Sequence, residues 1–186
     1  MVRLKKMNLD HYLNKKTLII GDVNSGKTQL TADFIAACCR EGLGQETVIL
    51  DFAPEPIRGI GGKLPASPCE PPLLLTCPII APRLTGLDAD HIQMLAEQNA
   101  REIEPLLWNA KRVRRTILAI NDVTLYLQSG RLDRIVDLMD MHSTSVINAY
   151  YGRSMPPAPF TEHELAQVDG LAEHCDRIIR LKAKAC

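Results

Sequence analysis

Short apolar runs alternate along the chain with longer stretches in which apolar residues recur three or four positions apart. The short runs are rich in Ile, Leu, Val and Thr, and such runs predict buried strands. A further apolar run, at 73–77, lies within a proline-rich region and is a candidate for one more short strand. The main predicted strands cover residues 17–21, 47–51, 116–122, 144–150 and 175–181.

The stretches between the strands have the spacing of helices with one apolar face. Gly42 and Gly44 mark the end of the first helix, and Pro105 is expected to kink or split the second, because proline interrupts helical hydrogen bonds. The last helix begins with a capping-box pattern, TEHE at 161–164, between a hydrophobic pair placed as a staple. The predicted helices cover about 27–40, 88–111, 132–141 and 161–172.

The alternation of strands and helices predicts the fold class. Strands that alternate with helices form a parallel sheet covered on both faces, so we expect a three-layer α/β/α sandwich with a mostly parallel central sheet of about five strands. A chain of 186 residues suits one domain with a buried core. We therefore predict a single domain, residues 1–186, without internal repeats.

A proline- and glycine-rich insertion interrupts this alternation at about residues 53–83. Eight of the twelve prolines lie between Pro54 and Pro82, and proline interrupts both helices and sheets, so most of the insertion is expected to be loop. Loops of this length in a compact domain are often lids or binding loops. A functional loop and a surface excursion without a special role both remain open.

The charge balance and cysteine content limit the partners of the protein. Lys plus Arg and Asp plus Glu are both 22, which argues against a generic nucleic-acid binder. The basic run KRVRR, 111–115, is interpreted as a solvated helix end. The chain has no long apolar run and no secretory signal, so we expect a cytoplasmic protein without a membrane partner. Six cysteines in a reducing compartment do not form a disulfide framework.

The segment GDVNSGKT, 21–28, carries the strongest chemical prediction. It matches the pattern G-x-x-x-x-G-K-[ST], and it lies between a predicted strand and a predicted helix, as that pattern requires. Glycines at its first and sixth positions let the backbone N–H groups converge on an anion, and the amino end of the following helix adds positive potential. This is the phosphate-binding loop (P-loop, or Walker A motif) of nucleotide-binding proteins, so the expected fold is that of the P-loop NTPases.

Each residue of the loop has an expected role toward a nucleotide. Lys27 is expected to reach the β- and γ-phosphates and to act in catalysis, and the hydroxyl of Thr28 is expected to bind Mg²⁺. The expected cofactors are thus ATP, or another nucleoside triphosphate, and magnesium. The backbone supplies the remaining contacts. The predicted nucleotide-binding residues are Gly21, Asp22, Val23, Asn24, Ser25, Gly26, Lys27, Thr28 and Gln29.

Two carboxylates are candidates for holding the water of the magnesium ion. Asp51 and Asp122 each follow an apolar run, as expected of acids delivered to the carboxyl ends of strands, where ligands of parallel sheets bind. Asn121 stands where many P-loop proteins carry the acid that faces the metal, and an amide brings no charge. We therefore predict Asp122 or Asp51 as the acid, with Asp122 as the water-mediated magnesium ligand.

The second half of the chain resembles the P-loop type of corrinoid (cobalamin) adenosyltransferases. The similar segments are ILAINDVTLYLQSGRLD, SVINAYYGR and HCDRIIRLK, which begin at residues 117, 145 and 174. The resemblance implies a P-loop fold that binds Mg-ATP and transfers an adenosyl group to a reduced corrinoid, leaving triphosphate. The chain differs from that family in having Asn121–Asp122 where the family has Asp-Glu, and Gln29 where it has a second Thr.

Other functions agree with the same motif. The order of the loop, a helix and VILDFAPEPIRG is similar in layout to small-molecule P-loop kinases, in which Asp51 would activate a hydroxyl and Arg58 would bind phosphate. A non-enzymatic ATP-binding switch or regulatory protein is the third hypothesis, favoured by Asn121. We lean toward an ATPase or nucleotide-dependent transferase, with an unidentified second substrate or protein partner. Assembly into a homo-oligomer stays open.

Overall fold

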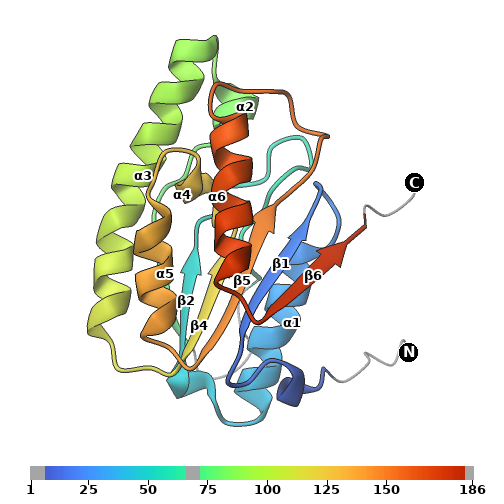
Figure 1. Ribbon diagram of the computed structural model, residues 1–186, viewed down its shortest axis with the longest axis vertical. Coiled ribbons are helices and arrows are strands. Elements are labelled where there is room, and N and C mark those ends of the chain that lie inside the picture. The colour runs from blue at the N-terminus through green and yellow to red at the C-terminus, as the bar shows by residue number, and fades with distance from the viewer. Residues whose placement is uncertain (1–6, 66–71, 183–186) are drawn as a thin grey trace.

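The computed structural model describes residues 7–65 and 72–182. Its centre is a six-stranded sheet with the strand order β3-β2-β4-β5-β1-β6, in which every pair of neighbours is parallel (Figure 1). The sheet is therefore entirely rather than mostly parallel, and it has one strand more than the expected five or so. The strands are β1 (Lys16–Gly21), β2 (Thr47–Asp51), β3 (Leu73–Thr76), β4 (Ile117–Asn121), β5 (Thr144–Tyr150) and β6 (Arg177–Leu181).

Helices cover both faces of the sheet, which confirms the three-layer α/β/α arrangement (Figure 1). One face carries α1 and a short 3₁₀ helix, η1, and the other carries α3, α4, α5 and α6. The near-continuous apolar runs of the strands explain why both faces are covered, because a strand buried on both faces needs apolar residues at every position. The helices are η1 (Leu9–His11), α1 (Lys27–Arg40), η2 (Gly44–Glu46), α2 (Pro82–Thr85), α3 (Ala89–Arg112), α4 (Thr124–Leu127), α5 (Leu132–Asp140) and α6 (Thr161–Glu173).

Strand β1 illustrates how the sequence builds two cores. Leu18 and Ile20 pack in the cluster under α3 to α6, whereas Ile19 packs with Phe34 of α1 in the cluster on the opposite face. All three β1 residues are at most 2% exposed. Consecutive side chains of a strand point to opposite faces, so one short run supplies both layers.

Two local predictions are corrected, one of them in part. Pro105 does not split α3, which is a single helix from Ala89 to Arg112, because packing of its apolar face into the core outweighs the missing hydrogen bond. A kink, the other expected effect of Pro105, stays a prediction. The predicted capping box of α6 is also wrong. Phe160 occupies the N-cap position, the Thr161 hydroxyl accepts from Ala158 N–H at 2.8 Å, and the Glu164 carboxylate takes part in a buried ion pair instead.

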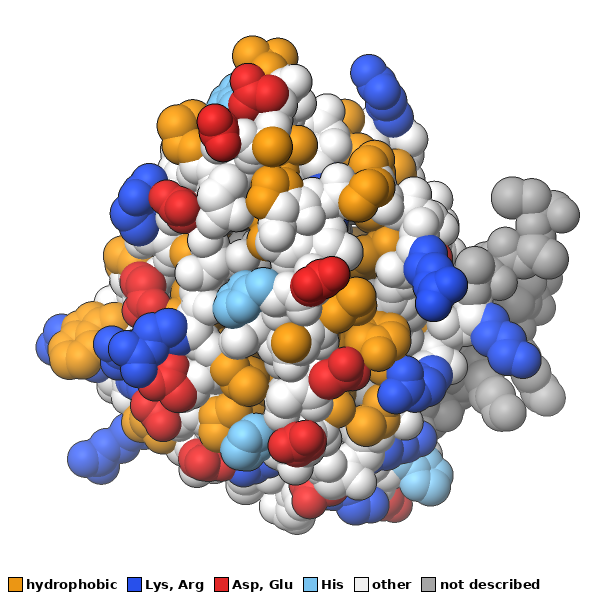
Figure 2. Space-filling view, turned by 45° about the horizontal axis from the view of Figure 1, so that its top comes forward, with side chains coloured by type: hydrophobic (Ala, Val, Ile, Leu, Met, Phe, Trp, Pro, Cys, Tyr) orange, Lys and Arg blue, Asp and Glu red, His pale blue; other side chains and the backbone are white. Residues whose placement is uncertain are grey.

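The carboxyl ends of the parallel strands all lie at the same end of the sheet. In the strand order, β5 lies between β1 and β4. Strand β1 is one position from the edge strand β6, so the loop that follows it lies toward that side of the sheet. On the face drawn in Figure 2, acidic and basic side chains are interspersed. Among the described residues, no helix is long and apolar enough to cross a membrane.

Candidate functional site

A cavity of about 320 Å³ lies at the carboxyl ends of the central strands, a size within the usual range for small-molecule sites. One wall is formed by Val23 to Thr28, the loop between β1 and α1, and the opposite wall comes from α2, α4 and α6. Pro54, Ile60 and Gly61 bring the proline-rich insertion into its lining. Of the predicted nucleotide-binding residues, Gly21, Asp22 and Gln29 are the ones that do not line it.

The backbone of this loop is curled by residues in the left-handed region. Asn24 has φ of 55° and Gly26 has φ of 95°, a conformation that glycine adopts without strain. Gly21 is required for a different reason, since a Cβ there would lie 2.6 Å from the Leu181 carbonyl oxygen and 2.7 Å from Ser25 Oγ. Gly21 thus permits a close approach that a side chain would obstruct, and Gly26 permits a backbone conformation that other residues rarely adopt.

The amino end of α1 opens onto the cavity. Gly26 is its N-cap, and no described side chain caps this end. The first N–H groups of a helix lack partners within the helix, so they are available to an anion. A Cβ at Gly26 would meet no described atom within 4 Å, which leaves open space beside these N–H groups.

Lys27 is folded back onto its own loop. Its Nζ donates to the Asp22 carbonyl at 2.7 Å and to Ser25 Oγ at 3.5 Å, and it lies 5.9 Å from the centre of the Tyr150 ring. Burial lowers the pKa of Lys27, while the charges of Asp122 and Asp22 oppose that shift. The ammonium group is thus held by a carbonyl that an anionic ligand can readily replace.

Asp22 fixes the loop to the segment after β5. Its carboxylate accepts from the N–H groups of Val23 at 2.7 Å and Arg153 at 3.1 Å. Burial raises the pKa of Asp22, but hydrogen bonds from Ser154, Val23 and Arg153 lower it overall. A Cβ on Gly152 would lie 2.3 Å from the carboxyl carbon of Asp22, so the approach needs glycine there.

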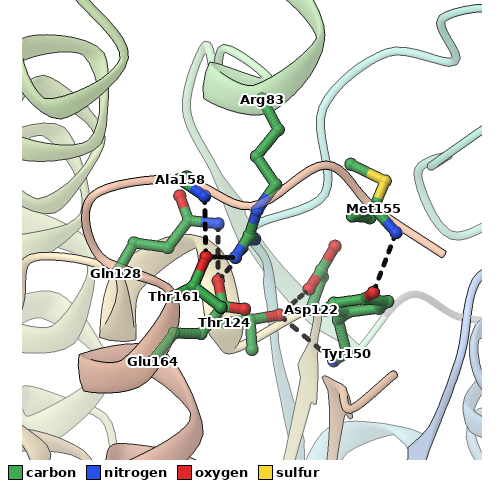
Figure 3. Close-up of polar contacts among 9 residues, drawn as sticks. All are labelled: Arg83, Asp122, Thr124, Gln128, Tyr150, Met155, Ala158, Thr161 and Glu164. Carbon is green, nitrogen blue, oxygen red and sulfur yellow. Dashed lines mark hydrogen bonds and ion pairs between the residues drawn. The ribbon is translucent and has the colours of Figure 1, made fainter. Parts of the chain in front are cut away.

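Asp122 enters the cavity directly after β4. Its φ is 59°, unusual for a residue other than glycine, and its N–H donates to Asn148 Oδ1 at 2.9 Å. The Thr124 hydroxyl donates to Asp122 Oδ1 (Figure 3). Burial raises the pKa of Asp122 to about 6; the Thr124 hydrogen bond and the Lys27 charge reduce the shift, and Glu164 and Asp51 add to it. This carboxylate therefore exchanges a proton near neutral pH.

Asp51 lies in a different environment from Asp122, although both residues directly follow an apolar run. It is 2% exposed, and it is absent from the described cavity lining. Its carboxylate accepts from the N–H groups of Ala53 at 3.2 Å and Leu64 at 2.8 Å, and from Asn121 Nδ2 at 2.8 Å. These bonds anchor the first part of the proline-rich insertion to the end of β2.

Asn121 is an amide because its neighbour is already a carboxylate. Its Nδ2 donates to Asp51 Oδ1 at 2.8 Å, and its Oδ1 accepts from Asn148 Nδ2 at 2.8 Å. An acid at position 121 would place two carboxylates in contact in a fully buried site, where like charges cannot both ionise. The negative charge on the cavity side is supplied by the next residue, Asp122.

Asn148 links the two halves of the site, and sequence analysis missed it. Its Nδ2 donates to Asn121 Oδ1 and to Thr31 Oγ1 of α1, both at 2.8 Å, and its Oδ1 accepts from Asp122 N–H. Every hydrogen-bonding atom of this 1%-exposed side chain is used. An asparagine flanked by apolar residues within a predicted strand was the available signal, because buried amides need partners.

A buried ion pair in the opposite wall was also missed. Arg83 Nη1 and Glu164 Oε2 are 2.9 Å apart, and Gln128 Nε2 donates to the same oxygen at 2.8 Å (Figure 3). Arg58, the candidate of the kinase hypothesis, is exposed and lies outside the described cavity lining. Tyr150 lines the cavity, and its hydroxyl accepts from Met155 N–H at 3.0 Å.

The described side chains do not form a metal site by themselves. Within residues 7–65 and 72–182, no group of three or more His, Cys, Asp or Glu is placed to hold an ion. Magnesium usually keeps several waters and binds through one or two protein ligands plus substrate phosphates. The donor set of the cavity, a Thr hydroxyl and a nearby Asp, suits an ion that arrives with phosphate.

Comparison with known proteins adds no family to this picture. No protein-family model matches the chain, and a search of curated proteins finds no similar sequence.

The raised pKa of Asp122 has a measurable effect on the ligand-free protein. Because the pKa of Asp122 rises from 3.8 to about 6 on folding, the folded protein is more stable when this side chain is protonated than when it is ionised. This stabilisation is complete below about pH 4 and is lost as the pH rises through 6. We expect the free energy of unfolding of Asp122→Asn, relative to wild type, to increase by about 2 kcal/mol between pH 4 and 7. Urea unfolding of both proteins between pH 4 and 7 tests this prediction. A difference in the free energy of unfolding that does not change with pH would contradict a raised pKa for Asp122.

Proposed function

We propose that the protein binds a magnesium–nucleoside triphosphate complex in this cavity and acts as an ATPase or nucleotide-dependent transferase. The observation that carries the proposal is the wall formed by Val23 to Thr28, in which a curled backbone, an uncapped helix end and the Lys27 ammonium group surround one open space. Each of these is a group that binds polyphosphate. The residues present therefore fit the proposed ligand.

The roles of the side chains follow from their positions. Lys27 would exchange the Asp22 carbonyl for phosphate oxygens, gaining charge-assisted hydrogen bonds. Thr28 would hold the magnesium ion, and Asp122 would hold one of its waters. When bound, the metal supplies charge neutralisation for the phosphates. Asp122 lines the cavity and would also accept a proton from a water or hydroxyl nucleophile.

Asp122 is favoured over Asp51 in this role, because three hydrogen bonds hold the Asp51 carboxylate and it is absent from the described cavity lining. Asp122→Asn is expected to lower turnover roughly 10²- to 10³-fold while changing nucleotide affinity little. Asp51→Asn, the matched variant, is expected to lose stability and to retain turnover per folded molecule. The kinase hypothesis predicts the reverse order, so steady-state rates of both variants, corrected for the folded fraction, decide between them.

The reaction class is tested by its product. Purified protein is incubated with Mg²⁺ and a panel of nucleotides, and thermal shifts are recorded together with the release of phosphate, pyrophosphate and triphosphate. Phosphate release supports hydrolysis, and triphosphate release upon addition of a reduced corrinoid supports adenosyl transfer. Binding without any product supports the switch, a second candidate that the uncharged Asn121 favours. Absence of a thermal shift with every nucleotide would overturn the proposal.

A further inference from the structure

The wall opposite the phosphate-binding loop contains a second buried cation, Arg83. Its side chain is 5% exposed, and it lies 2.9 Å from Glu164, which is 1% exposed. Its Nη2 donates to Thr161 Oγ1 at 3.2 Å, and its guanidinium carbon is 4.7 Å from the centre of the Phe160 ring. Arg83 begins α2 with Pro82 at the end of the proline-rich insertion, and it lines the cavity.

One donor of this arginine has no acceptor. Arg83 Nε is buried and makes no hydrogen bond to any described residue. A buried donor without a partner is costly, and native proteins generally provide one from protein, water or ligand. An arginine guanidinium also presents its donors in a planar fork that matches carboxylate and phosphate oxygens. The unpaired Nε–H shows that the hydrogen bonds of Arg83 are incomplete among the described residues, although this residue lines the cavity.

Arg83 and Lys27 face the same part of the cavity. Both lie over the Tyr150 ring, with the Arg83 guanidinium carbon at 5.8 Å and Lys27 Nζ at 5.9 Å from its centre. The two cations are thus no more than about 12 Å apart, and both line the cavity. A ligand with several phosphate groups is able to contact both.

We propose that Arg83 binds a phosphate-type oxyanion in the same cavity as the P-loop; where that oxyanion is the γ-phosphate of the nucleotide, Arg83 makes the site prefer a nucleoside triphosphate to a diphosphate. This inference rests on the proposed nucleotide binding. The oxyanion has two sources, the γ-phosphate of the nucleotide or a phosphate group on a separate second ligand. Glu164 limits the preference, because its carboxylate repels an anion that approaches Arg83.

The test measures dissociation constants by isothermal titration calorimetry, with Mg²⁺, for ADP, the non-hydrolysable triphosphate AMP-PNP, and ADP with added inorganic phosphate. In the wild type we expect AMP-PNP to bind at least tenfold more tightly than ADP. Arg83→Gln should reduce this ratio to about threefold or less, since a charge-assisted hydrogen bond is worth roughly ten- to a hundredfold in affinity. Its ADP affinity should stay within about threefold of wild type.

Two further variants keep the test independent of folding. Arg83→Gln leaves Glu164 as an unpaired buried charge, so the double variant Arg83→Gln/Glu164→Gln, which removes both charges, should lose the same preference in a stable protein. Glu164→Gln alone should increase the preference for AMP-PNP, because it removes the repulsion and keeps the arginine. Arg58→Gln, at an exposed position, is the matched control and should behave as wild type.

Each outcome is decisive. A wild type that binds neither nucleotide overturns the proposed function, and with it this inference. A wild type that binds both nucleotides equally and binds no phosphate beside ADP overturns the inference alone, and so do Arg83 variants that match the wild type in both measurements. If Glu164→Gln lowers the preference for AMP-PNP over ADP as much as Arg83→Gln does, the ion pair is purely structural. Phosphate that binds beside ADP only when Arg83 is present supports the second source of the oxyanion.

Discussion

Replacing Lys27 with alanine is expected to weaken Mg-ATP binding by at least about a hundredfold, the effect of losing one or two charge-assisted hydrogen bonds to phosphate. The stability of the variant should change little, since Lys27 Nζ contacts only the Asp22 carbonyl and Ser25 Oγ among the described hydrogen-bond partners. Isothermal titration calorimetry measures the affinity, and a urea unfolding curve checks the fold.

The matched control is Lys15→Ala, which removes an exposed lysine just before β1 and leaves the loop intact. It carries the same change in net charge, so it separates a local contact from a general electrostatic effect. Its affinity should equal that of the wild type at moderate salt, because distant surface charges are screened. Equal affinities for Lys27→Ala and Lys15→Ala would contradict phosphate binding by the loop.

Asn121→Asp is expected to cause the largest loss of stability, about 4 kcal/mol. The new carboxylate would lie against Asp51, where Asn121 Nδ2 now donates at 2.8 Å. Two acids in contact in a buried site must share a proton, which raises one pKa by roughly three units, and each unit corresponds to about 1.4 kcal/mol. Equilibrium unfolding in urea at pH 7 gives the free energy of unfolding of each variant.

The control for this prediction exchanges the two residues. Asp51→Asn combined with Asn121→Asp restores one carboxylate and one amide, and it should recover at least half of the lost stability. The coupling energy of the double-mutant cycle measures the contact directly. Additive losses in the two single variants would show that the Asp51–Asn121 contact does not explain why position 121 is an amide.

The fold was largely predictable because its information is local. The alternation of apolar runs with amphipathic stretches gave β2, β5 and α1 with the bounds that the structure has, and the turn at Gly21 follows from the glycine spacing of one motif. Strand β3, which is additional to the five main predicted strands, was also visible in the sequence as the apolar run that begins at Leu73. The local capping rule failed at the start of α6, because Glu164 pairs with the distant Arg83 instead of capping the helix.

The two walls of the cavity were not equally predictable. Asp51 and Asp122 have similar sequence surroundings, and only the strand order, a non-local property, shows which of them reaches the cavity. Arg83 and Glu164 are separated by 81 residues, so their pairing leaves no trace in either segment alone. Asn148 was detectable as a buried polar residue, but its partners come from α1 and from the end of β4.

The most direct test of the central claim observes the backbone N–H groups of the loop themselves. In ¹H–¹⁵N NMR spectra of the assigned protein, addition of Mg-ATP should shift the amide signals of residues 22–28, whereas adenosine at the same concentration should leave them unchanged. Phosphate contacts with these N–H groups predict this result. Amide signals in the loop that do not respond to saturating Mg-ATP, while others elsewhere do, would contradict the account.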